Sequence, residues 1–291
     1  MENPEKIGLV VEGGGMKCAY NAGILDAFID YGISFDYCIG VSGGAGNAAS
    51  FVAGQRGRNL RFYTEHIHSP RFFGLRSLLR SGDLFGLKYI YGELTNSTGK
   101  DPLDYPAMME SATQYQLAVT NAATGQPEYF GKEDMKQDDY RLIMASCAIP
   151  VACHPVEING QFYFDGGLVD AVPVRHALEE GCSRLVVLLT KSRGYVKAPQ
   201  NMRWLYSRLR RKYPKIVSAI DQRHVTYNEN LKKVYELERE GKAFVFAPSQ
   251  SVKAGTYSMK EEQERALYEL GMEDFKARYE NLKKFLKTAE S

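Results

Sequence analysis

Two glycine-rich segments near the start of the chain contain the residues best suited to chemistry. The second segment consists of Gly40, Val41, Ser42, Gly43 and Gly44. It fits the G-x-S-x-G pattern, in which a strand turns sharply into a helix and exposes a serine hydroxyl. A serine hydroxyl attacks an ester carbonyl once a nearby base takes its proton, and the oxyanion that forms needs hydrogen-bond donors. Ser42 is therefore the candidate nucleophile of an acyl-transfer reaction.

The first glycine-rich segment can supply those donors. It consists of Gly13, Gly14, Gly15, Met16 and Lys17. Without side chains, glycine N–H groups can approach a substrate oxygen closely, and a helix that begins near Lys17 adds its positive end. Lys17 brings a further positive charge, and the N–H of Gly43, directly after the nucleophile, is the second donor expected at such a turn.

A candidate base follows a predicted β-hairpin. The alternating segments 156–158 and 161–164 flank Asn159-Gly160, a strong hairpin signal because both turn positions require positive φ. Asp165 ends the second strand, and Gly166 and Gly167 let the backbone turn away at once. Asp165 is thus expected on a rigid element beside a flexible turn, as suits a catalytic carboxylate.

Short apolar runs alternate with helix-like segments along the chain. The runs are 7–11, 37–41, 117–120, 185–189 and 244–247, and they do not alternate with polar residues, as expected of strands buried on both faces. Helices are expected at 19–28, 43–53, 105–112, 174–180 and 220–240, and charged helical stretches at 260–287. The pattern predicts an α/β fold with a mostly parallel sheet between helices. We expect one domain over 1–291, with a motif-bearing core at 7–174 and a helical C-terminal part at 200–291.

Length, charge and cysteine content limit the class of protein. A chain of 291 residues with 44% hydrophobic residues can bury a large core. Its 37 basic and 35 acidic residues nearly cancel, so no nucleic-acid partner is expected. The apolar run at 7–11 is too short for a signal peptide, and no stretch approaches the roughly 18 apolar residues of a membrane span. Five cysteines without C-x-x-C spacing suit a reducing, cytoplasmic setting, and Cys18 is expected to be a packing residue.

The combination of motifs resembles the patatin-like phospholipases. The order matches: a glycine-rich loop at 13–17, G-x-S-x-G around Ser42, the segment Ala-Ser-Cys-Ala-Ile-Pro at 145–150 and Asp-Gly-Gly at 165–167. The resemblance covers about 7–174, and it is specific because the motifs occur together. It implies a three-layer α/β/α fold, hydrolysis of acyl esters by a Ser-Asp dyad without histidine, and no metal or organic cofactor.

Carried over to this sequence, the resemblance makes Ser42 the nucleophile that forms an acyl-serine and Asp165 its proton acceptor. The segment from Gly13 to Lys17 becomes the oxyanion loop. The family often has glycine where this chain has Cys18, which would matter if that position required positive φ. An aspartate with an ordinary pKa of about 4 is a weak base, so a dry setting is expected, to which residues 162–164 would contribute. Activity is expected to persist below about pH 6, where histidine is protonated.

Three alternatives stay open. A dinucleotide site would use the G-x-G-x-x-A match at 44–49, but the acidic residue it needs falls in a helix-like run at 60–65. A Ser-His-Asp hydrolase would add His176 or His224, although Ser42 comes early in the chain for that fold. A non-catalytic lipid- or membrane-binding protein of the same fold would need none of these residues together. The five histidines show no metal-ligand spacing.

The sequence leaves the lipid class open among phospholipid, lysophospholipid, neutral glyceride and other acyl esters. Segments 71–80 and 84–87 mix bulky apolar residues with arginines, and can form a lid or acyl groove or pack in the core. The run from Arg203 to Lys215 joins Trp204 to arginines and lysines. It can rest on an anionic membrane surface, which would place a cytoplasmic protein peripherally on the inner face, or it can be a solvated helix.

Overall fold

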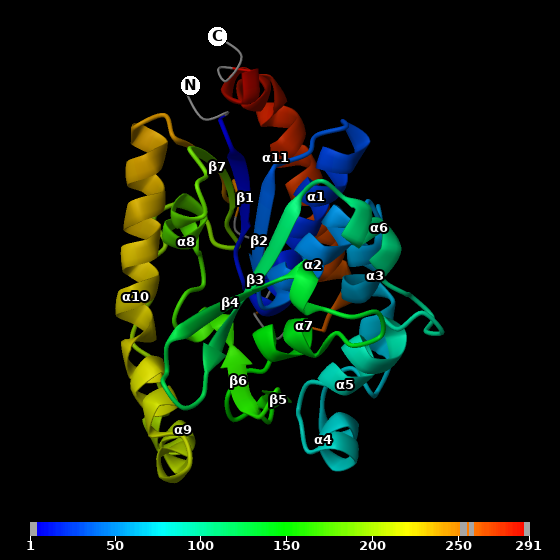
Figure 1. Cartoon of the computed structure of the whole chain (residues 1–291), viewed down its shortest axis with the longest axis vertical. Coiled ribbons are helices and arrows are strands. Elements are labelled where there is room, and N and C mark those ends of the chain that lie inside the picture. The colour runs from blue at the N-terminus through cyan, green and yellow to red at the C-terminus, as the bar shows by residue number, and fades with distance from the viewer. Residues whose placement is uncertain (1–4, 251–254, 256–258, 288–291) are drawn as a thin grey trace.

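A mixed sheet lies at the centre of the molecule in the computed structural model, which describes residues 5–250, 255 and 259–287 (Figure 1). Its strands are β1 (Ile7–Val11), β2 (Tyr37–Val41), β3 (Gln114–Asn121), β4 (Pro127–Gly131), β5 (Val156–Ile158), β6 (Gln161–Asp165), β7 (Arg184–Leu188) and β8 (Ala243–Phe246). The order is β5-β6-β3-β2-β1-β7-β8, and β4 also pairs with β3. Strands β3, β2, β1, β7 and β8 run parallel, whereas β4, β5 and β6 form an antiparallel edge.

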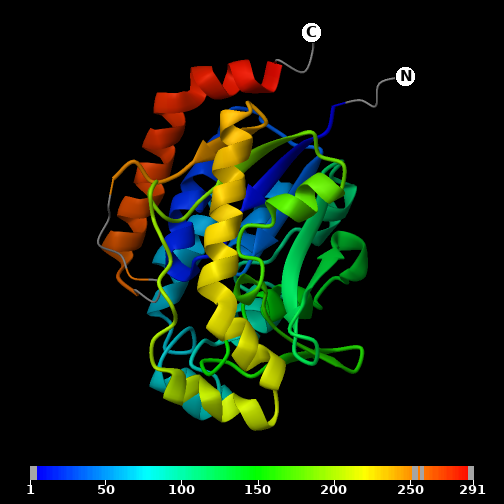
Figure 2. The ribbon, with the colours of Figure 1, turned by 90° about the vertical axis from the view of Figure 1, so that its left-hand side faces the viewer.

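Helices cover both faces of the sheet. One face carries α1 (Ala19–Asp30), α2 (Gly43–Val52), α3 (Arg58–Thr64), α6 (Tyr105–Glu110), α7 (Arg141–Ser146) and α11 (Glu261–Lys287). The other carries α8 (Val174–Glu179) and α10 (Pro214–Arg239), and α10 crosses the front of Figure 2. The short helices α4 (Leu75–Ser81), α5 (Leu87–Tyr89) and α9 (Arg203–Tyr206) lie at one end of the molecule. The expected three-layer α/β/α fold is confirmed.

The parallel strands are apolar throughout because both of their faces are buried. In β1, Leu9 and Val11 pack with α1 and α11, while Val10 packs with α8 and α10. The same alternation holds in β7, where Val186 and Val187 belong to opposite layers. Successive side chains of a strand point to opposite faces, so the side chains of a continuous apolar run pack into the hydrophobic layers on both sides of the sheet.

Element boundaries differ from the sequence prediction at a few places. Strand β3 starts at Gln114 rather than 117, and α10 starts at Pro214 rather than 220, with proline in the first turn, where its missing N–H costs nothing. Strand β4 escaped prediction because only its last residue, Gly131, is buried. The predicted hairpin is confirmed as β5 and β6, with φ of 52° at Asn159 and 78° at Gly160.

The C-terminal helix packs directly on the helix that follows β1. A Cβ on Gly23 of α1 would lie 2.1 Å from the carbonyl oxygen of Tyr268, and one on Gly271 of α11 would lie 2.2 Å from that of Tyr20. The two helix backbones are therefore in contact. A buried hydrogen bond of 2.8 Å from the Tyr20 hydroxyl to Asp274 joins the same pair of helices. The C-terminal part of the chain thus shares a core with the motif-bearing part.

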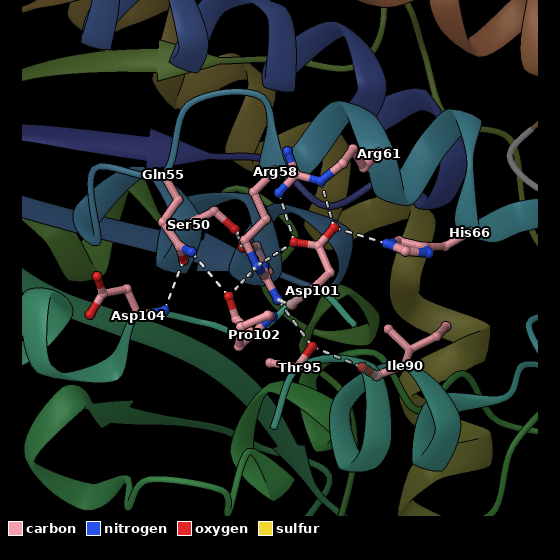
Figure 3. Close-up of polar contacts among 11 residues, drawn as sticks. Ser50, Gln55, Arg58, Arg61, His66, Ile90, Thr95, Asp101, Pro102 and Asp104 are labelled. Carbon is pink, nitrogen blue, oxygen red and sulfur yellow. Dashed lines mark hydrogen bonds and ion pairs between the residues drawn. The ribbon is translucent and has the colours of Figure 1, made fainter. Parts of the chain in front are cut away.

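A buried ion network fixes the loop before α6 onto α2 and α3 (Figure 3). Asp101 is 4% exposed and accepts two hydrogen bonds of 2.7 Å from Arg61 and one of 2.8 Å from His66. Arg58, also 4% exposed, lies 3.7 Å from the same carboxylate. Its guanidinium also donates to Ser50, Thr95 and the carbonyls of Asp101 and Pro102. One buried carboxylate thus holds two arginines and a loop in place.

We predict that Asp101→Asn lowers the free energy of unfolding by about 2 kcal/mol near neutral pH. Burial alone raises the pKa of Asp101, but the hydrogen bonds from Arg61 and His66 and the charge of Arg58 lower it to about 2. Because this folded-state pKa lies below the ordinary value of about 4, the stabilisation is present above about pH 4 and is lost as the pH falls toward 2. Urea unfolding of wild type and variant at pH values from about 7 to 3 measures the difference.

Asp30→Asn is the matched control. Asp30 also makes a bidentate pair, with Arg56 at 2.7 and 2.9 Å, but the Arg56 side chain is 51% exposed. Solvent screening limits such surface pairs to less than about 1 kcal/mol. Equal losses in the two variants, or an Asp101→Asn loss that is the same near pH 3 as near pH 7, would contradict the prediction.

Candidate active site

Ser42 occupies a strained turn between β2 and α2. Its φ of 55° and ψ of −131° lie in a region that residues with a side chain rarely adopt. The turn is held from α7: the N–H of Ser42 donates to Ser146 Oγ at 2.8 Å, and Ser146 Oγ donates to the Ala118 carbonyl at 2.7 Å. Sequence reasoning missed Ser146 as a functional residue. The sequence signal for it is a serine within the otherwise apolar segment 145–150.

Strand register brings Asp165 to Ser42. Ala118 of β3 lies opposite Val41 of β2, and Val119 lies opposite Asp165 of β6. Ser42, which follows Val41, and Asp165 therefore lie on either side of the same stretch of β3. Ser42 Oγ donates a hydrogen bond of 2.7 Å to Asp165 Oδ2. The other oxygen, Oδ1, accepts one of 2.7 Å from the Gly167 N–H, which fixes the carboxylate plane. Both side chains are buried, with Ser42 7% and Asp165 4% exposed.

The surroundings of Asp165 raise its pKa. Burial is the main cause, while the positive charge of Arg223 and the hydrogen bonds from Ser42 and Gly167 oppose it. A carboxylate with a raised pKa is a stronger base, as proton transfer from a hydroxyl requires. Phe164 is buried, but Phe162 is 39% exposed and does not contribute to the dry setting expected of it.

The five histidines lie outside the cavities that contain Ser42. None of the five lines either of the cavities that Ser42 lines. His176 stacks on Tyr129 at 3.5 Å and contacts Gln116 at 2.8 Å, and His224 lies on α10. Neither reaches Ser42, so the geometry does not assemble a Ser-His-Asp triad. Within the described residues, no group of three or more His, Cys, Asp or Glu side chains could hold a metal ion.

The glycine-rich loop after β1 lies beside the Ser42 turn. A Cβ on Gly13 would lie 3.0 Å from the Ser42 Cβ, and one on Gly43 would lie 3.2 Å from the Gly15 carbonyl. The N–H of Gly13 donates weakly to the Ala171 carbonyl, at 3.4 Å, and the Gly14 backbone hydrogen-bonds to the Cys18 thiol, whereas the N–H of Gly15 has no backbone hydrogen-bond partner among the described residues. Gly15 has a φ of 59°. The N–H of Gly15 is therefore a donor available beside the nucleophile.

The remaining predicted residues are placed as follows. Met16 lines an apolar cavity next to Ser42, but Lys17 lines a separate depression with Thr190 and Arg193. Lys17 thus lines neither of the cavities that Ser42 lines, and the contribution of its charge at Ser42 stays a prediction. Cys18 is fully buried with a helical φ of −66°, so its position does not require positive φ, and burial raises the pKa of its thiol.

The motif glycines permit close backbone contacts. A Cβ on Gly44 would lie 2.6 Å from the Glu12 carbonyl, and one on Gly40 would lie 2.4 Å from the Gly44 carbonyl. A Cβ on Gly166 would lie 2.2 Å from the Ala118 carbonyl. A side chain at Gly44 would separate the turn from the end of β1, one at Gly40 would separate α2 from β2, and one at Gly166 would separate Asp165 from β3.

Ser42 lies at the boundary between two cavities. An apolar cavity of about 90 Å³ is lined by Ser42 together with Phe62, Phe72, Leu87, Ile90 and Tyr91. A cavity of about 250 Å³, called here the basic cavity, is lined by Ser42 and Asp165 together with Lys191, Lys197 and Arg223. An outer groove of about 330 Å³ shares Ile149 with both and runs between Phe73 and Leu84, on either side of α4, and residues of α9.

The site lies where the strand order reverses. From β1 the chain proceeds to β2 and β3 on one side, and later adds β7 and β8 on the other. Loops at the carboxyl ends of β1 and β7 diverge at such a point and leave a crevice, which is the usual ligand site of open α/β sheets. Among the described residues no helix has the length and apolar content needed to cross a membrane.

Comparison with known proteins agrees with this geometry. A family model described as patatin-like phospholipase matches residues 9–178, and a model of a domain of unknown function, DUF6363, matches residues 213–287. A protein of Escherichia coli (strain K12) described as "Uncharacterized protein YjjU" is 32% identical over 200 residues, covering 68% of this chain and 55% of that protein. The chain thus spans about half the length of the curated relative it matches.

Among solved structures, VipD from Legionella pneumophila aligns with a TM-score of 0.47 at 14% identity, covering 94% of this chain and 66% of that chain. The patatin-like model spans more than half of the 291 residues and includes the glycine-rich loop, the Ser42 turn and the Asp165 turn. The chain therefore belongs to the patatin-like phospholipase family, a family of lipid acyl hydrolases.

Proposed function

We propose that this protein hydrolyses acyl esters of lipids with Ser42 as nucleophile and Asp165 as base. The proposal rests on one observation above all, the 2.7 Å hydrogen bond from Ser42 Oγ to a buried Asp165 oxygen. Nucleophile and base within hydrogen-bond reach, with the base held by a third group, are typical of activated serine nucleophiles. Here the third group is the N–H of Gly167.

The reaction follows from the positions of these groups. Ser42 Oγ attacks the ester carbonyl while its proton passes to Asp165, and the N–H groups of Gly15 and Gly43 stabilise the oxyanion. One such donor contributes roughly 3 kcal/mol to the transition state. The alcohol departs with the proton from Asp165 and leaves an acyl-Ser42. Water then attacks the acyl carbonyl and gives a proton to Asp165, which passes it to Ser42 Oγ as the acyl bond breaks, so that the fatty acid leaves and both groups are regenerated.

The cavities suggest where the two parts of the ester bind. Aromatic and aliphatic side chains line the apolar cavity beside Ser42, and we propose that the first carbons of the acyl chain bind there. Phe72, Phe85 and Leu87 come from the region 71–87 and line the cavity, and Phe72 and Leu87 are also buried in hydrophobic clusters. A longer chain would continue into the outer groove, which shares Phe85 and Ile149 with the apolar cavity.

Hydrolysis through the dyad is tested with Ser42→Ala, Asp165→Asn and His224→Ala. We expect Ser42→Ala to abolish both turnover of short and long acyl esters and labelling by a fluorophosphonate probe. Asp165→Asn should reduce turnover by a factor on the order of a hundred or more, because general-base catalysis contributes about that much. His224→Ala should retain activity.

Two results would count against the dyad. Loss of activity in His224→Ala with Asp165→Asn unaffected would favour a triad. A folded wild type that neither binds the probe nor turns over ester would favour the alternative of a non-catalytic lipid-binding protein. Circular dichroism of each variant checks that it is folded.

The pH profile gives an independent prediction. The base must be ionised, so activity falls as the pH drops through the Asp165 pKa. Because burial raises this pKa, the acidic limb of kcat/KM should lie above the ordinary carboxyl value of about 4. Arg223→Gln removes a positive charge that lowers the Asp165 pKa, so the limb should move to higher pH. A limb that moves in His176→Ala and not in Arg223→Gln would contradict the assignment.

We propose further that one end of the molecule rests on an anionic membrane. Exposed apolar side chains gather there on α4 and α9, with Leu75 68%, Leu79 79% and Trp204 62% exposed. These two helices lie at the same end in both views (Figures 1 and 2). Segments 69–82 and 196–220 contain arginines and lysines but no aspartate or glutamate. Apolar side chains with basic neighbours suit the interface of an anionic bilayer.

The outer groove supports this orientation. It is lined by Phe73 and Leu84 on one side and by Met202 and Leu205 on the other, so it opens beside the proposed membrane contact. A lipid could enter from the bilayer through this groove and reach Ser42. For a cytoplasmic protein, this end would face the inner leaflet of the membrane.

Vesicle co-sedimentation tests the membrane contact. We expect binding to vesicles with anionic lipid and weak binding to neutral vesicles. Arg208→Gln combined with Arg210→Gln should weaken binding by roughly thirty-fold, because each basic residue contributes about 1 kcal/mol near the headgroups. Lys232→Gln combined with Arg239→Gln removes two charges toward the far end of α10 and serves as control. Equal recovery in the supernatant with and without anionic lipid would refute the proposal.

A further inference from the structure

A buried glutamate stands directly before the glycine-rich loop. Glu12 follows the last residue of β1 and is 1% exposed, yet it lines the basic cavity together with Ser42 and Asp165. The proposed reaction gives it no role. A buried carboxylate costs free energy unless hydrogen bonds satisfy its oxygens. The hydrogen-bond partners of Glu12 therefore indicate what its side chain does.

Both oxygens of this carboxylate are hydrogen-bonded to other elements. Oε1 accepts a hydrogen bond of 2.6 Å from the hydroxyl of Tyr227, which lies on α10. Oε2 accepts one from the N–H of Thr190, two residues beyond the end of β7. Tyr227 and Thr190 are both buried, so water does not compete for these contacts. The carboxylate thus joins the end of β1 to β7 and to α10.

The backbone of Glu12 is also hydrogen-bonded. Its N–H donates to the Leu188 carbonyl of β7 at 3.0 Å. Its carbonyl accepts a hydrogen bond of 3.3 Å from Asn21 Nδ2 of α1, and a weaker one of 3.5 Å from the Cys18 thiol. Because α1 and α10 cover opposite faces of the sheet, residue 12 is fixed from both helical layers.

Both parts of the expected oxyanion hole pack against these atoms. A Cβ on Gly14 would lie 2.6 Å from Thr190 Oγ1, so the glycine-rich loop is in close contact with the residue that binds the Glu12 carboxylate. A Cβ on Gly44 would lie 2.6 Å from the Glu12 carbonyl oxygen, so the Ser42 turn is in close contact with Glu12 itself. Glu12 therefore lies between the loop and the turn.

The glycine-rich loop has few hydrogen bonds of its own. The N–H of Gly13 reaches the Ala171 carbonyl only at 3.4 Å, and the N–H of Gly15 has no backbone partner among the described residues. Glycine also has more backbone freedom than any other residue. The position of this loop relative to the nucleophile thus depends on how its ends are held, and Glu12 is the residue at its first end.

We propose that Glu12 is a positioning residue for the oxyanion hole. Its carboxylate, held by Thr190 and Tyr227, keeps the glycine-rich loop at a fixed distance from Ser42. At that distance the Gly15 N–H can reach the oxyanion of the substrate. This inference rests on the proposed function. Donors that are already in place stabilise the transition state selectively, so a displaced loop slows the chemical step and leaves ground-state binding unchanged.

This role brings the C-terminal part of the chain into the reaction. Thr190 and Tyr227 lie outside the region 9–178 that the patatin-like model matches. Tyr227 lies within the region 213–287 that matches a domain of unknown function. On this account α10 helps to hold the oxyanion loop, although both reacting side chains come from the first region.

Glu12→Ala and a pair of inhibitors test the inference. An alkyl trifluoromethyl ketone adds to the Ser42 hydroxyl and forms an oxyanion, whereas the ether analogue of the ester has no carbonyl and forms none. We count active sites by end-point labelling with the fluorophosphonate probe. Per active site, kcat/KM should fall by a factor of about ten to a hundred. The Ki of the ketone should rise by the same factor, and the Ki of the ether should not change.

Two further variants separate hydrogen bonding from charge. Glu12→Gln keeps an acceptor for the Thr190 N–H and an amide that can bond to Tyr227, so its kcat/KM should stay within about threefold of wild type. Tyr227→Phe removes one of the two hydrogen bonds and should lower kcat/KM by about threefold to tenfold. Added to Glu12→Ala it should change little more, because both substitutions remove the same contact.

Tyr20→Phe is the matched control. The Tyr20 hydroxyl donates a buried hydrogen bond of 2.8 Å to Asp274 and joins α1 to α11, and neither residue lines a cavity that Ser42 lines. Like Tyr227→Phe, this variant loses a buried hydroxyl that donates to a carboxylate. We expect a lower thermal midpoint in both variants, but an unchanged kcat/KM per active site in Tyr20→Phe.

The outcomes are distinguishable. If wild type neither turns over ester nor binds the probe, the proposed function fails. If wild type is active and Glu12→Ala changes neither kcat/KM per active site nor the ketone Ki, the hydrolase proposal stands and the positioning role is refuted. The role is also refuted if the ketone and ether Ki values rise together, or if Glu12→Gln loses as much activity as Glu12→Ala.

Tyr227→Phe decides the question should Glu12→Ala fail to fold. A weaker ketone Ki with an unchanged ether Ki in this variant supports the positioning role. Two unchanged Ki values refute it.

Discussion

The hydrogen bond between Ser42 and Asp165 is the interaction on which the rest of the site depends. It joins residues 123 positions apart. It forms because Val41 of β2 pairs with Ala118 of β3, and the next residue of β3, Val119, pairs with Asp165 of β6. A slip of one residue in either pairing would turn these side chains to the opposite face. The strained Ser42 backbone persists because Ser146 bridges it to β3.

Two layers of helices contribute differently to this arrangement. Helices on the α1 side pack around the Ser42 turn, the glycine-rich loop and the apolar cavity. In the same layer, the Asp101 network joins α2 and α3 to the loop before α6 (Figure 3). Helix α10 on the other side brings Arg223 and Tyr227 to the basic cavity. On our account the acyl group is recognised from the first of these layers, beside Ser42. The close contact of α1 with α11 keeps both halves in one core.

Local sequence signals explain how much could be predicted. The Ser42 turn, the hairpin and Asp165 could be located because each depends on glycine or asparagine at fixed positions, which is chemistry local to a few residues. The buried parallel strands could be located because both of their faces are apolar. The edge strand β4 could not, since it buries little.

The residues that escaped prediction act over long sequence distances. Ser146 and Arg223 reach the site only through tertiary packing, and no local pattern distinguishes them from other buried serines or helical arginines. Adjacency to the glycines predicts Lys17 at the site, whereas Lys17, in the 3-10 turn η1 (Gly15–Cys18), lines a separate depression. Lys191 lines both that depression and the basic cavity, so it brings a positive charge to a cavity that Ser42 lines.

Detection of an acyl group on Ser42 tests the central claim most directly. Wild-type protein would be mixed with an acyl ester, quenched in acid during turnover, digested, and its peptides weighed by mass spectrometry. Our account predicts an acyl adduct on the peptide that contains Ser42, and none in Ser42→Ala. Turnover of the ester without an adduct on Ser42, or with an adduct on another residue such as Cys147 in the adjoining apolar cavity, would contradict it.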